Sequence, residues 1–188
     1  MHVDIKKLGR IPDGGGWKIH GKGTGQHHRS RRVANRPAPQ KSYRYLHHAV
    51  DDYSRVVYSE ILDDEKRDTA AGFWTRARGF FTALGVKVSE VMTDNGSCYR
   101  SHAFADALGP EVKHRWTRPY RPQTNGKVER FNRTLMTEWA YARPYLSEAS
   151  REEVYGEFID HYNRRRAHTG IGGLAPMDRV HNLTGKYS

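Results

Sequence analysis

Val88-Ser-Glu-Val-Met-Thr-Asp94-Asn-Gly96 and Thr124-Asn-Gly-Lys-Val-Glu129-Arg-Phe-Asn-Arg-Thr-Leu135 are the two segments that decide the fold. The first reads as an apolar strand that stops at Asn-Gly, which breaks strand pairing and leaves the carboxylate of Asp94 facing out of the sheet. The second reads as an amphipathic helix with Glu129 on its first turn. A third acid, Asp4, lies in an expected strand over residues 1–8. Three carboxylates from three elements could therefore converge on one site for hard divalent cations.

Length and composition indicate one domain with appended segments. The chain has 188 residues, of which 36% are hydrophobic, so it can bury a core but keeps much of its surface solvated. A single cysteine, Cys98, excludes a disulfide framework and a Cys-rich zinc site, and fits a reducing cytoplasm. No apolar run reaches the roughly 18 residues of a membrane span. We expect a soluble, cytoplasmic protein with no membrane partner.

Positive charge is concentrated in two parts of the chain. The formal net charge is +11. Residues 10–42 hold eight Lys or Arg against one acid, residues 43–110 carry a net charge of −2, and residues 111–188 carry +5. Basic segments that flank an acidic centre are expected if the acids hold metal while the surround contacts phosphates. The plainer interpretation is a charged surface that only maintains solubility.

The hydrophobic pattern predicts an α/β order of β-β-β-α-β-α-β-α-α. Strands are expected over 1–8, 42–51, 55–62, 86–93 and 112–116; helices over 68–84 (capped by Asp68), 101–108, 126–143 and 148–165; and an extended tail over 171–188. The domain itself is expected to span residues 1–170. Such an order favours a five-stranded mixed sheet with helices on both faces.

Residues 9–42 are rich in glycine and basic side chains and read as an insertion between the first two strands. They lack the spacing of a phosphate-binding Walker loop, and His27 and His28 have no cysteine nearby to complete a zinc site. The preferred interpretation is a DNA contact, through Arg29, Arg31 and Arg32, that becomes ordered on binding.

Each candidate carboxylate has a plainer alternative. Asp51 and Asp52 could compete with Asp4 as a ligand, but they fall in a predicted turn, where Asp is favoured because it bonds to the backbone. Glu129 and Arg133 could form an ordinary surface pair at i,i+4, worth a few tenths of a kcal/mol.

Five blocks of the chain resemble the catalytic core of the integrase and insertion-sequence transposase superfamily. They are Val-Asp4-Ile-Lys, Ala-Val-Asp-Asp52-Tyr-Ser-Arg55, Thr-Asp94-Asn-Gly, Arg118-Pro-Tyr-Arg-Pro-Gln-Thr-Asn-Gly-Lys-Val-Glu129-Arg-Phe-Asn-Arg-Thr-Leu, and Tyr162-Asn-Arg-Arg-Arg-Ala-His168 followed by Ala175-Pro. The blocks occur in the family's order and extend over almost the whole chain. Ala167 departs from the pattern, because the family usually has proline there.

The resemblance implies an RNase H-like fold and a DDE triad of Asp4, Asp94 and Glu129. These residues would bind two Mg²⁺ ions, for which Mn²⁺ can substitute, and the reaction would be hydrolysis at an element's 3′ end followed by strand transfer into target DNA. Proposed phosphate contacts are Lys127, Arg130, Arg133, Arg118 and Arg121. Since two DNA ends must be held together, we expect a homodimer or a larger assembly.

Two other functions remain open from the sequence. The chain begins three residues before Asp4, which leaves no room for the helix-turn-helix that relatives use, so a non-catalytic DNA-binding fragment acting in assembly or inhibition is one alternative. The other is an RNase H-like nuclease or resolvase, against which the helix entry at Glu129 and the arginine-rich block after Tyr162 both argue.

Overall fold

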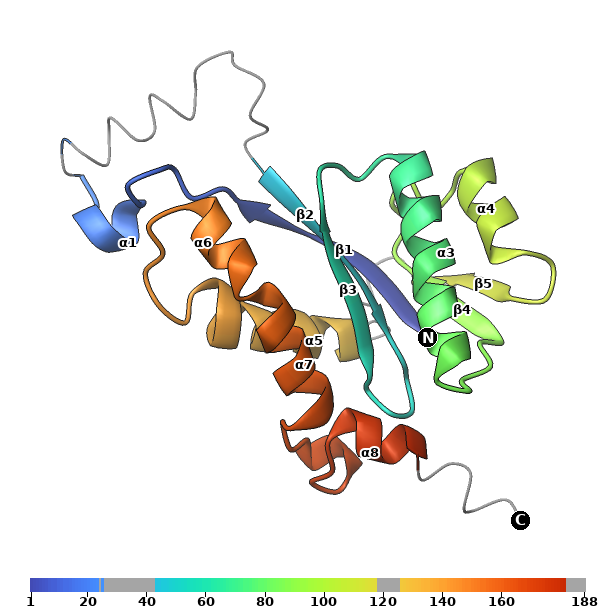
Figure 1. Cartoon of the computed structure of the whole chain (residues 1–188). Coiled ribbons are helices and arrows are strands. Elements are labelled where there is room, and N and C mark those ends of the chain that lie inside the picture. The colour runs from blue at the N-terminus through green and yellow to red at the C-terminus, as the bar shows by residue number, and fades with distance from the viewer. Residues whose placement is uncertain (24, 26–42, 118–125, 182–188) are drawn as a thin grey trace.

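The computed structural model describes residues 1–23, 25, 43–117 and 126–181 of the chain. Most of the predicted basic insertion, and the loop before the predicted catalytic helix, lie outside these residues. Within them, five strands form one mixed sheet in the order β3-β2-β1-β4-β5, with helices on both faces (Figure 1). The predicted five-stranded α/β architecture is therefore confirmed.

The first strand lies at the centre of the sheet. β1 pairs antiparallel with β2, which pairs antiparallel with β3, while β4 runs parallel to β1 and β5 runs parallel to β4. The strand bounds are β1 (His2–Gly9), β2 (Tyr43–Val50), β3 (Val57–Leu62), β4 (Glu90–Thr93) and β5 (Lys113–Trp116). Asp4 is paired with His48 of β2, whereas β1 pairs with β4 only at His2, so Asp4 lies where β4 has just ended.

Helices α3 (Arg67–Ala83), α4 (His102–Leu108) and α8 (Pro176–His181) contribute to the core on one face of the sheet. Their apolar side chains meet the sheet residues whose side chains point to that face. Members of this core include Val3, Ala49, Phe73, Trp74, Phe81, Val91, Phe104, Met177 and Val180. Each large apolar side chain buried in this way stabilises the fold by about 1.5–3 kcal/mol.

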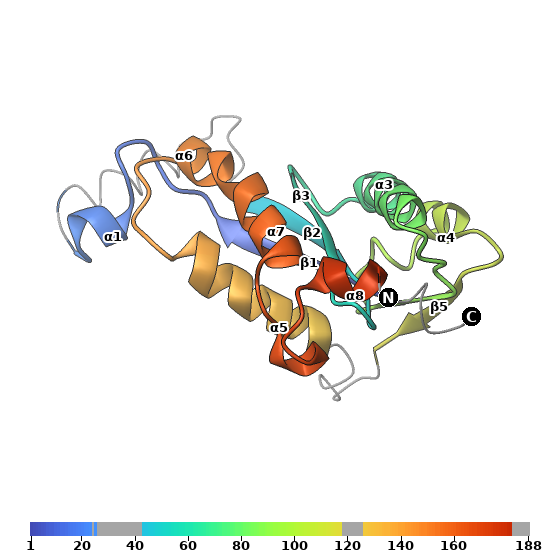
Figure 2. The same ribbon diagram turned by 60° about the horizontal axis from the view of Figure 1, so that its bottom comes forward.

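The opposite face is covered by α5 (Gly126–Leu135), a π-helical turn η2 (Met136–Ala140) and α7 (Tyr155–Arg164), preceded by α6 (Glu148–Glu153). Figure 2 shows α5 and α7 on one side of the sheet and α3 and α4 on the other. Val128, Phe131 and Leu135, spaced by three and four residues, form the buried stripe of α5. This packing fixes α5 against β1 and β2, the strands next to the predicted site.

The predicted helix over residues 126–143 was too long. The α-helical part of α5 ends at Leu135, and the N–H of Tyr141 donates to the carbonyl of Met136 at 3.0 Å, which is the i−5 bond of a π-turn. The wider turn places Trp139 in the core, where its indole N–H donates to the carbonyl of Arg151 at 3.0 Å. The spacing of apolar residues in the sequence does not reveal such a turn. The π-turn depends on the contact between Trp139 and Arg151 of α6, which lies twelve residues further along the chain.

Other element boundaries also differ from those predicted. The helix expected over 148–165 is divided at Val154 into α6 and α7. Asp68 does not cap α3, because the helix begins at Arg67 and its N-cap is Lys66. Instead, Asp64 accepts a hydrogen bond from the backbone N–H of Lys66 at 3.1 Å. The strand expected over 86–93 is paired only from Glu90 onward.

The tail expected to be extended over 171–188 is largely folded in its described part. A 3₁₀ turn, η3 (Thr169–Ile171), is followed by α8, and residues 182–188 lie outside the described chain. Pro176 begins α8, a position where its missing N–H costs no helical bond. Met177 and Val180, three residues apart, are both buried. The prediction was wrong because this short helix is stabilised by burial rather than by its own propensity.

The described part of the 9–42 insertion contains a four-residue helix, α1 (Trp17–His20), at one end of the molecule (Figure 1). Lys18 joins it to the C-terminal half of the chain, because its Nζ donates to the carbonyl of Tyr141 at 2.8 Å. Among the described helices, none combines the length and the apolar composition needed to cross a membrane.

Candidate active site

Asp4 lies on β1, and Asp94 directly follows the neighbouring parallel strand β4. His2 of β1 is paired with Met92 of β4, and each acid comes two residues after its member of that pair, so the two acids lie at about the same level. Side chains two residues apart on a strand point to the same face. The register therefore places both carboxylates on one face of the sheet, where β4 ends.

Helix α5 lies over this pair and contacts Asp4 directly. The Nδ2 of Asn132 donates to Oδ2 of Asp4 at 2.9 Å. His48, the β2 partner of Asp4, packs edge-on against Phe131 with ring centroids 4.8 Å apart, so Asp4 and His48 both face α5. Glu129 is exposed and lies one turn before Asn132, on the same side of the helix. Asn132 was not predicted as a site residue, although its i+3 spacing from Glu129 is a signal that could have identified it.

The carboxyl group of Asp4 is harder to ionise than a free one. Burial raises the pKa of Asp4, the hydrogen bond from Asn132 acts in the opposite direction, and the negative charge of Asp94 raises the pKa further. The carboxylate of Asp94 therefore lies close enough to repel a negative charge on Asp4. A bound cation would relieve both the burial cost and this repulsion.

A tight turn holds Asp94 at the end of β4. Its Oδ1 accepts from the backbone N–H of Gly96 at 2.8 Å. A Cβ on Gly96 would lie 2.9 Å from that same oxygen, so a larger residue would displace the carboxylate. Asn95 ties the turn to the end of β5 because its Nδ2 donates to the carbonyl of Thr117 at 3.0 Å. The Asn-Gly pair therefore positions the acid as well as ending the strand.

The three predicted metal ligands are not gathered into one cluster. Within residues 1–23, 25, 43–117 and 126–181, no group of three or more His, Cys, Asp or Glu side chains is arranged to hold an ion. Asp4 and Asp94 are brought together, and Glu129 is directed from α5 to the same side. The donor chemistry of these three residues fits Mg²⁺, because all are carboxylate oxygens. In addition, the buried Oδ1 of Asn132 beside Asp4 has no hydrogen-bond partner in the described chain.

The two competing acids have other partners. Oδ2 of Asp51 accepts from the backbone N–H and the hydroxyl of Ser54, both at 2.7 Å, as expected for a turn residue. Asp52 forms an ion pair with Lys127, and its Oδ1 lies 3.0 Å from Nε2 of His2. Although partial burial acts to raise the pKa of Asp52, the bonds to Lys127 and His2 outweigh it and lower the pKa. This contact joins the β2–β3 turn to the start of α5.

The predicted DNA-contacting residues that the structure describes are grouped on α5. Lys127, Arg130 and Arg133 line a cavity of about 790 Å³ between α5, the β2–β3 turn and the segment after α7. Arg130 and Arg133 are exposed and make no ion pair with described residues, whereas Lys127 pairs with Asp52. Arg118, Arg121, Arg29, Arg31 and Arg32 lie outside the described residues, so their roles stay predictions.

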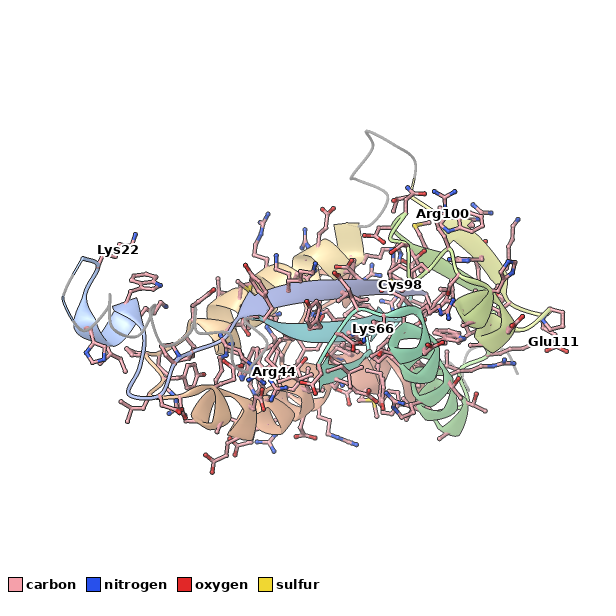
Figure 3. All side chains as sticks on the ribbon, turned by 90° about the horizontal axis from the view of Figure 1, so that it is seen from above. Lys22, Arg44, Lys66, Cys98, Arg100 and Glu111 are labelled. Carbon is pink, nitrogen blue, oxygen red and sulfur yellow. The ribbon has the colours of Figure 1, made fainter. Side chains whose placement is uncertain are left out.

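The single cysteine lies beside the site but has no nucleophilic character. Cys98 follows Asp94 in the same turn and lies near the start of β1 in Figure 3. Burial raises the pKa of its thiol to about 11, so the thiol stays protonated at neutral pH. The side chains at this site that can bind a metal ion or a phosphate are therefore its carboxylates and the cations of α5.

Comparisons with known proteins agree with this arrangement. Two family models, both described as integrase core domains, match residues 2–122 and 110–176. A putative integrase, ORF3 of Spiroplasma virus SpV1-C74, is 24% identical over 166 residues, which is 81% of this chain and 46% of that protein. The InsD transposase of Escherichia coli insertion element IS2 is 33% identical over 104 residues, which is 54% of this chain and 34% of that protein. The chain thus spans about half or less of the length of these relatives.

Solved structures show the same fold. The catalytic core of BIV integrase has a TM-score of 0.56 at 17% identity and covers 100% of this chain and 98% of its own. The HTLV-2 integrase catalytic core domain, solved in complex with magnesium in a trimeric form, has a TM-score of 0.59 at 17% identity, covering 96% and 95%. The chain is therefore a member of the integrase core domain family and has the RNase H-like fold of the retroviral integrase catalytic cores.

Proposed function

We propose that this chain is the catalytic core of a transposase or integrase, a divalent-metal-dependent polynucleotidyl transferase that cleaves DNA at the 3′ end of an element and transfers it to target DNA. The observation that carries the proposal is the placement of Asp4 beside the end of β4, where Asp94 follows, with Asn132 of α5 bonded to the Asp4 carboxylate. Membership of the integrase core family supports it, as does the magnesium complex of the HTLV-2 core.

Each residue of the site has a distinct task. Asp4, Asp94 and Glu129 would hold two Mg²⁺ ions, or Mn²⁺ in their place. When bound, such ions lower the pKa of an attacking water or hydroxyl and neutralise charge on the phosphate. Asn132 holds the Asp4 carboxylate in place by donating to Oδ2. Gly96 leaves room for the Asp94 carboxylate and bonds to it.

DNA ends and target DNA are the proposed partners, and the working form would be a dimer or larger. Support comes from the net charge of +11, from Arg130 and Arg133 of α5, which pair with no acid in the described part of the chain, and from neighbours that include a trimeric integrase core and a simian T-cell lymphotropic virus intasome. The intasome chain has a TM-score of 0.61 at 21% identity, with 96% of this chain and 54% of that chain covered. A bacterial element of this kind would act in the cytoplasm, at the nucleoid.

Disintegration, the reverse of strand transfer, tests the proposal. A branched oligonucleotide supplies the geometry of the joined product, so the assay does not need end-recognition domains. With Mn²⁺ present, the wild-type chain should resolve the branch, and Asp94→Asn or Glu129→Gln should reduce the rate to background. Asp106→Asn, an exposed acid on α4, is the matched control and should retain full rate.

Each contrary outcome has a definite meaning. Full activity in Asp94→Asn would show that the acidic pair is not the active site. A wild-type chain that binds DNA without resolving the branch would favour the non-catalytic DNA-binding fragment. Cut strands without joined ones would favour the nuclease or resolvase alternative.

A further inference from the structure

A single carboxylate in the turn between β2 and β3 joins three parts of the molecule. Oδ1 of Asp52 forms an ion pair with Nζ of Lys127 on α5 and lies 3.0 Å from Nε2 of His2 on β1. Nη1 of Arg55, in the same turn, lies 3.6 Å from this oxygen. Asp52 therefore ties its turn to β1 and to the first turn of α5, the helix that carries Glu129.

The backbone of the β2–β3 turn holds Asp52 in place. Arg55 has a φ of 71°, in the left-handed region that residues with a side chain rarely adopt. Its N–H donates to the carbonyl of Asp51 at 3.0 Å, and its guanidinium donates to the carbonyl of Asp52. On the other side of the turn, the guanidinium of Arg179 on α8 lies 4.1 Å from the ring centroid of Tyr53. Since its own bonds and α8 both fix the turn, Asp52 is a firm point of attachment.

Lys127 is the first residue of α5 with a side chain that can reach this turn. The helix begins at Gly126, which has no side chain, and its buried stripe begins at Val128. On an α-helix, residues two apart point to nearly opposite sides, so Lys127 and Glu129 lie on either side of Val128. An ion pair at Lys127 therefore limits rotation of the first turn about the helix axis, and with it the direction of the Glu129 carboxylate.

We propose that Asp52 is a positioning residue, which pairs with Lys127 and so holds the first turn of α5 with Glu129 on the side of Asp4. This role rests on the proposed function, because Glu129 acts beside Asp4 only there. The side chains of Lys127 and Asp52 are 36% and 49% exposed. Ion pairs between exposed side chains shift an equilibrium by up to about fivefold, which bounds the effect of losing this contact.

Hydrogen exchange of the full chain, followed by NMR without metal or DNA, measures the stability of this turn directly. In an α-helix the N–H groups of Arg130 and Phe131 bond to the carbonyls of Gly126 and Lys127, so their exchange reports opening of the first turn. Asp52→Asn keeps the shape of the side chain and removes its charge. It should speed exchange at these two amides by about three- to fivefold.

Further variants separate this contact from a general loss of charge. Lys127→Met should have the same effect as Asp52→Asn, and the double variant should have no larger effect than either, because both changes remove one interaction. Lys127→Arg should keep the exchange rates of the wild type, since arginine also pairs with a carboxylate. Asp160→Asn is the matched control and should leave α5 unchanged, because Asp160 is a partly exposed acid of α7 that pairs with Arg164 and Arg165.

The kinetics of branch resolution distinguish a positioning role from a phosphate contact. If Asp52 and Lys127 position Glu129, Asp52→Asn should raise the Mn²⁺ concentration for half-maximal rate by about three- to fivefold, with KM for the oligonucleotide little changed. If Lys127 instead binds phosphate, Asp52→Asn releases it for that task. KM should then fall while exchange at α5 stays the same, and this result would overturn the proposal.

The positioning role and the proposed function fail in different ways. Unchanged exchange in Asp52→Asn, with Glu129→Gln inactive, would overturn the positioning role alone. Faster exchange in Asp52→Asn, with full branch resolution by Glu129→Gln, would show that Asp52 holds α5 but would overturn the proposed function and the part of Glu129 in it. Effects of Asp52→Asn and Lys127→Met that multiply in the double variant would mean that the two residues act separately, against the proposal.

Discussion

Asp4 is the residue at which stability and function are most clearly opposed. Its pKa is raised above the ordinary value, mainly by burial, so the folded state holds its proton more tightly than the unfolded state. The resulting loss of stability develops as pH rises from the unfolded pKa of Asp4 through the folded one, and it persists above the folded pKa. An active site that needs a carboxylate here must therefore tolerate an unfavourable charge whenever no cation is bound.

Asp4→Asn should stabilise the metal-free chain at pH 7. The neutral amide avoids the burial cost and the repulsion from Asp94, and for a chain of this size each kcal/mol gained raises the Tm by about 2–4 °C. Thermal unfolding at pH 7 and pH 4 measures the effect, which should shrink at the lower pH because the raised pKa lets Asp4 take up a proton more readily than a free aspartate does. Asp106→Asn should change nothing, and a lower Tm for Asp4→Asn at pH 7 would contradict the assigned burial.

Asn132→Ala should impair catalysis through Asp4. The hydrogen bond from Asn132 lowers the pKa of Asp4, so its loss should raise that pKa and move the acidic limb of the pH–rate profile to higher pH. Loss of a group that orients a metal ligand typically costs about 10–100-fold in metal affinity or activity. Thr137→Ala, on the exposed side of η2, is the control for disturbance of the helix. An unmoved acidic limb would show that Asn132 does not act on Asp4.

At the scale of elements, the edge strand β3 depends on a side chain of α7. Asn163 both donates to and accepts from the backbone of Val57, in the way that a neighbouring strand would. These two hydrogen bonds hold α7 against the sheet. Arg166 and His168 follow in the chain directly after α7. Helix α7 thus stabilises the sheet and also leads the chain to Arg166 and His168, which line the cavity beside α5.

Asn163→Leu should destabilise the fold by roughly 2–5 kcal/mol, because it leaves a buried N–H and a buried carbonyl of Val57 without partners, at about 1–3 kcal/mol each. Urea unfolding followed by circular dichroism measures the change. Arg164→Gln, on the exposed side of the same helix, should stay within about 0.5 kcal/mol of the wild type. Equal stability of Asn163→Leu and the wild type would show that α7 is held by its apolar contacts alone.

At the scale of the whole molecule, two buried histidines make the fold sensitive to acid. Burial lowers the pKa of His48 to about 3, and burial also lowers the pKa of His47. Both side chains lie on β2, between the two helical layers. Because the unfolded chain takes up protons on these rings that the folded chain refuses, stability falls as pH drops below about 6.5.

The free energy of unfolding should therefore decrease by up to about 1.4 kcal/mol per pH unit through His48 between pH 6 and pH 4, and His47 should add to this decrease. Urea titrations at pH 7, 6 and 5 would show this slope. His48→Gln should flatten the slope by the share of one histidine, whereas His102→Gln, an exposed residue, should leave it unchanged. The same slope in wild type and His48→Gln would mean that His48 is accessible to protons in the folded state.

Much of the architecture follows from local chemistry. Strand alternation, the helical stripe of Val128, Phe131 and Leu135, and the Asn-Gly stop after Asp94 predicted the five strands and the main helices. The sequence predicts these features because each depends on the burial or the backbone conformation of residues that are close together in the chain. The motif order likewise indicated the family and named Asp4, Asp94 and Glu129 as candidates, which stay a prediction as metal ligands.

Tertiary structure decided the features that depend on partners distant in sequence. The π-turn at η2 forms where Trp139 meets Arg151, and α8 forms because Met177 and Val180 find a core to enter. The parallel register of β1 and β4 brings Asp4 level with Asp94 across 90 residues of chain. No local pattern specifies these contacts, because each depends on the free energy of assembling the whole core. The sequence by itself determined which residues could take part in the site, and only the packed fold decided which of them meet.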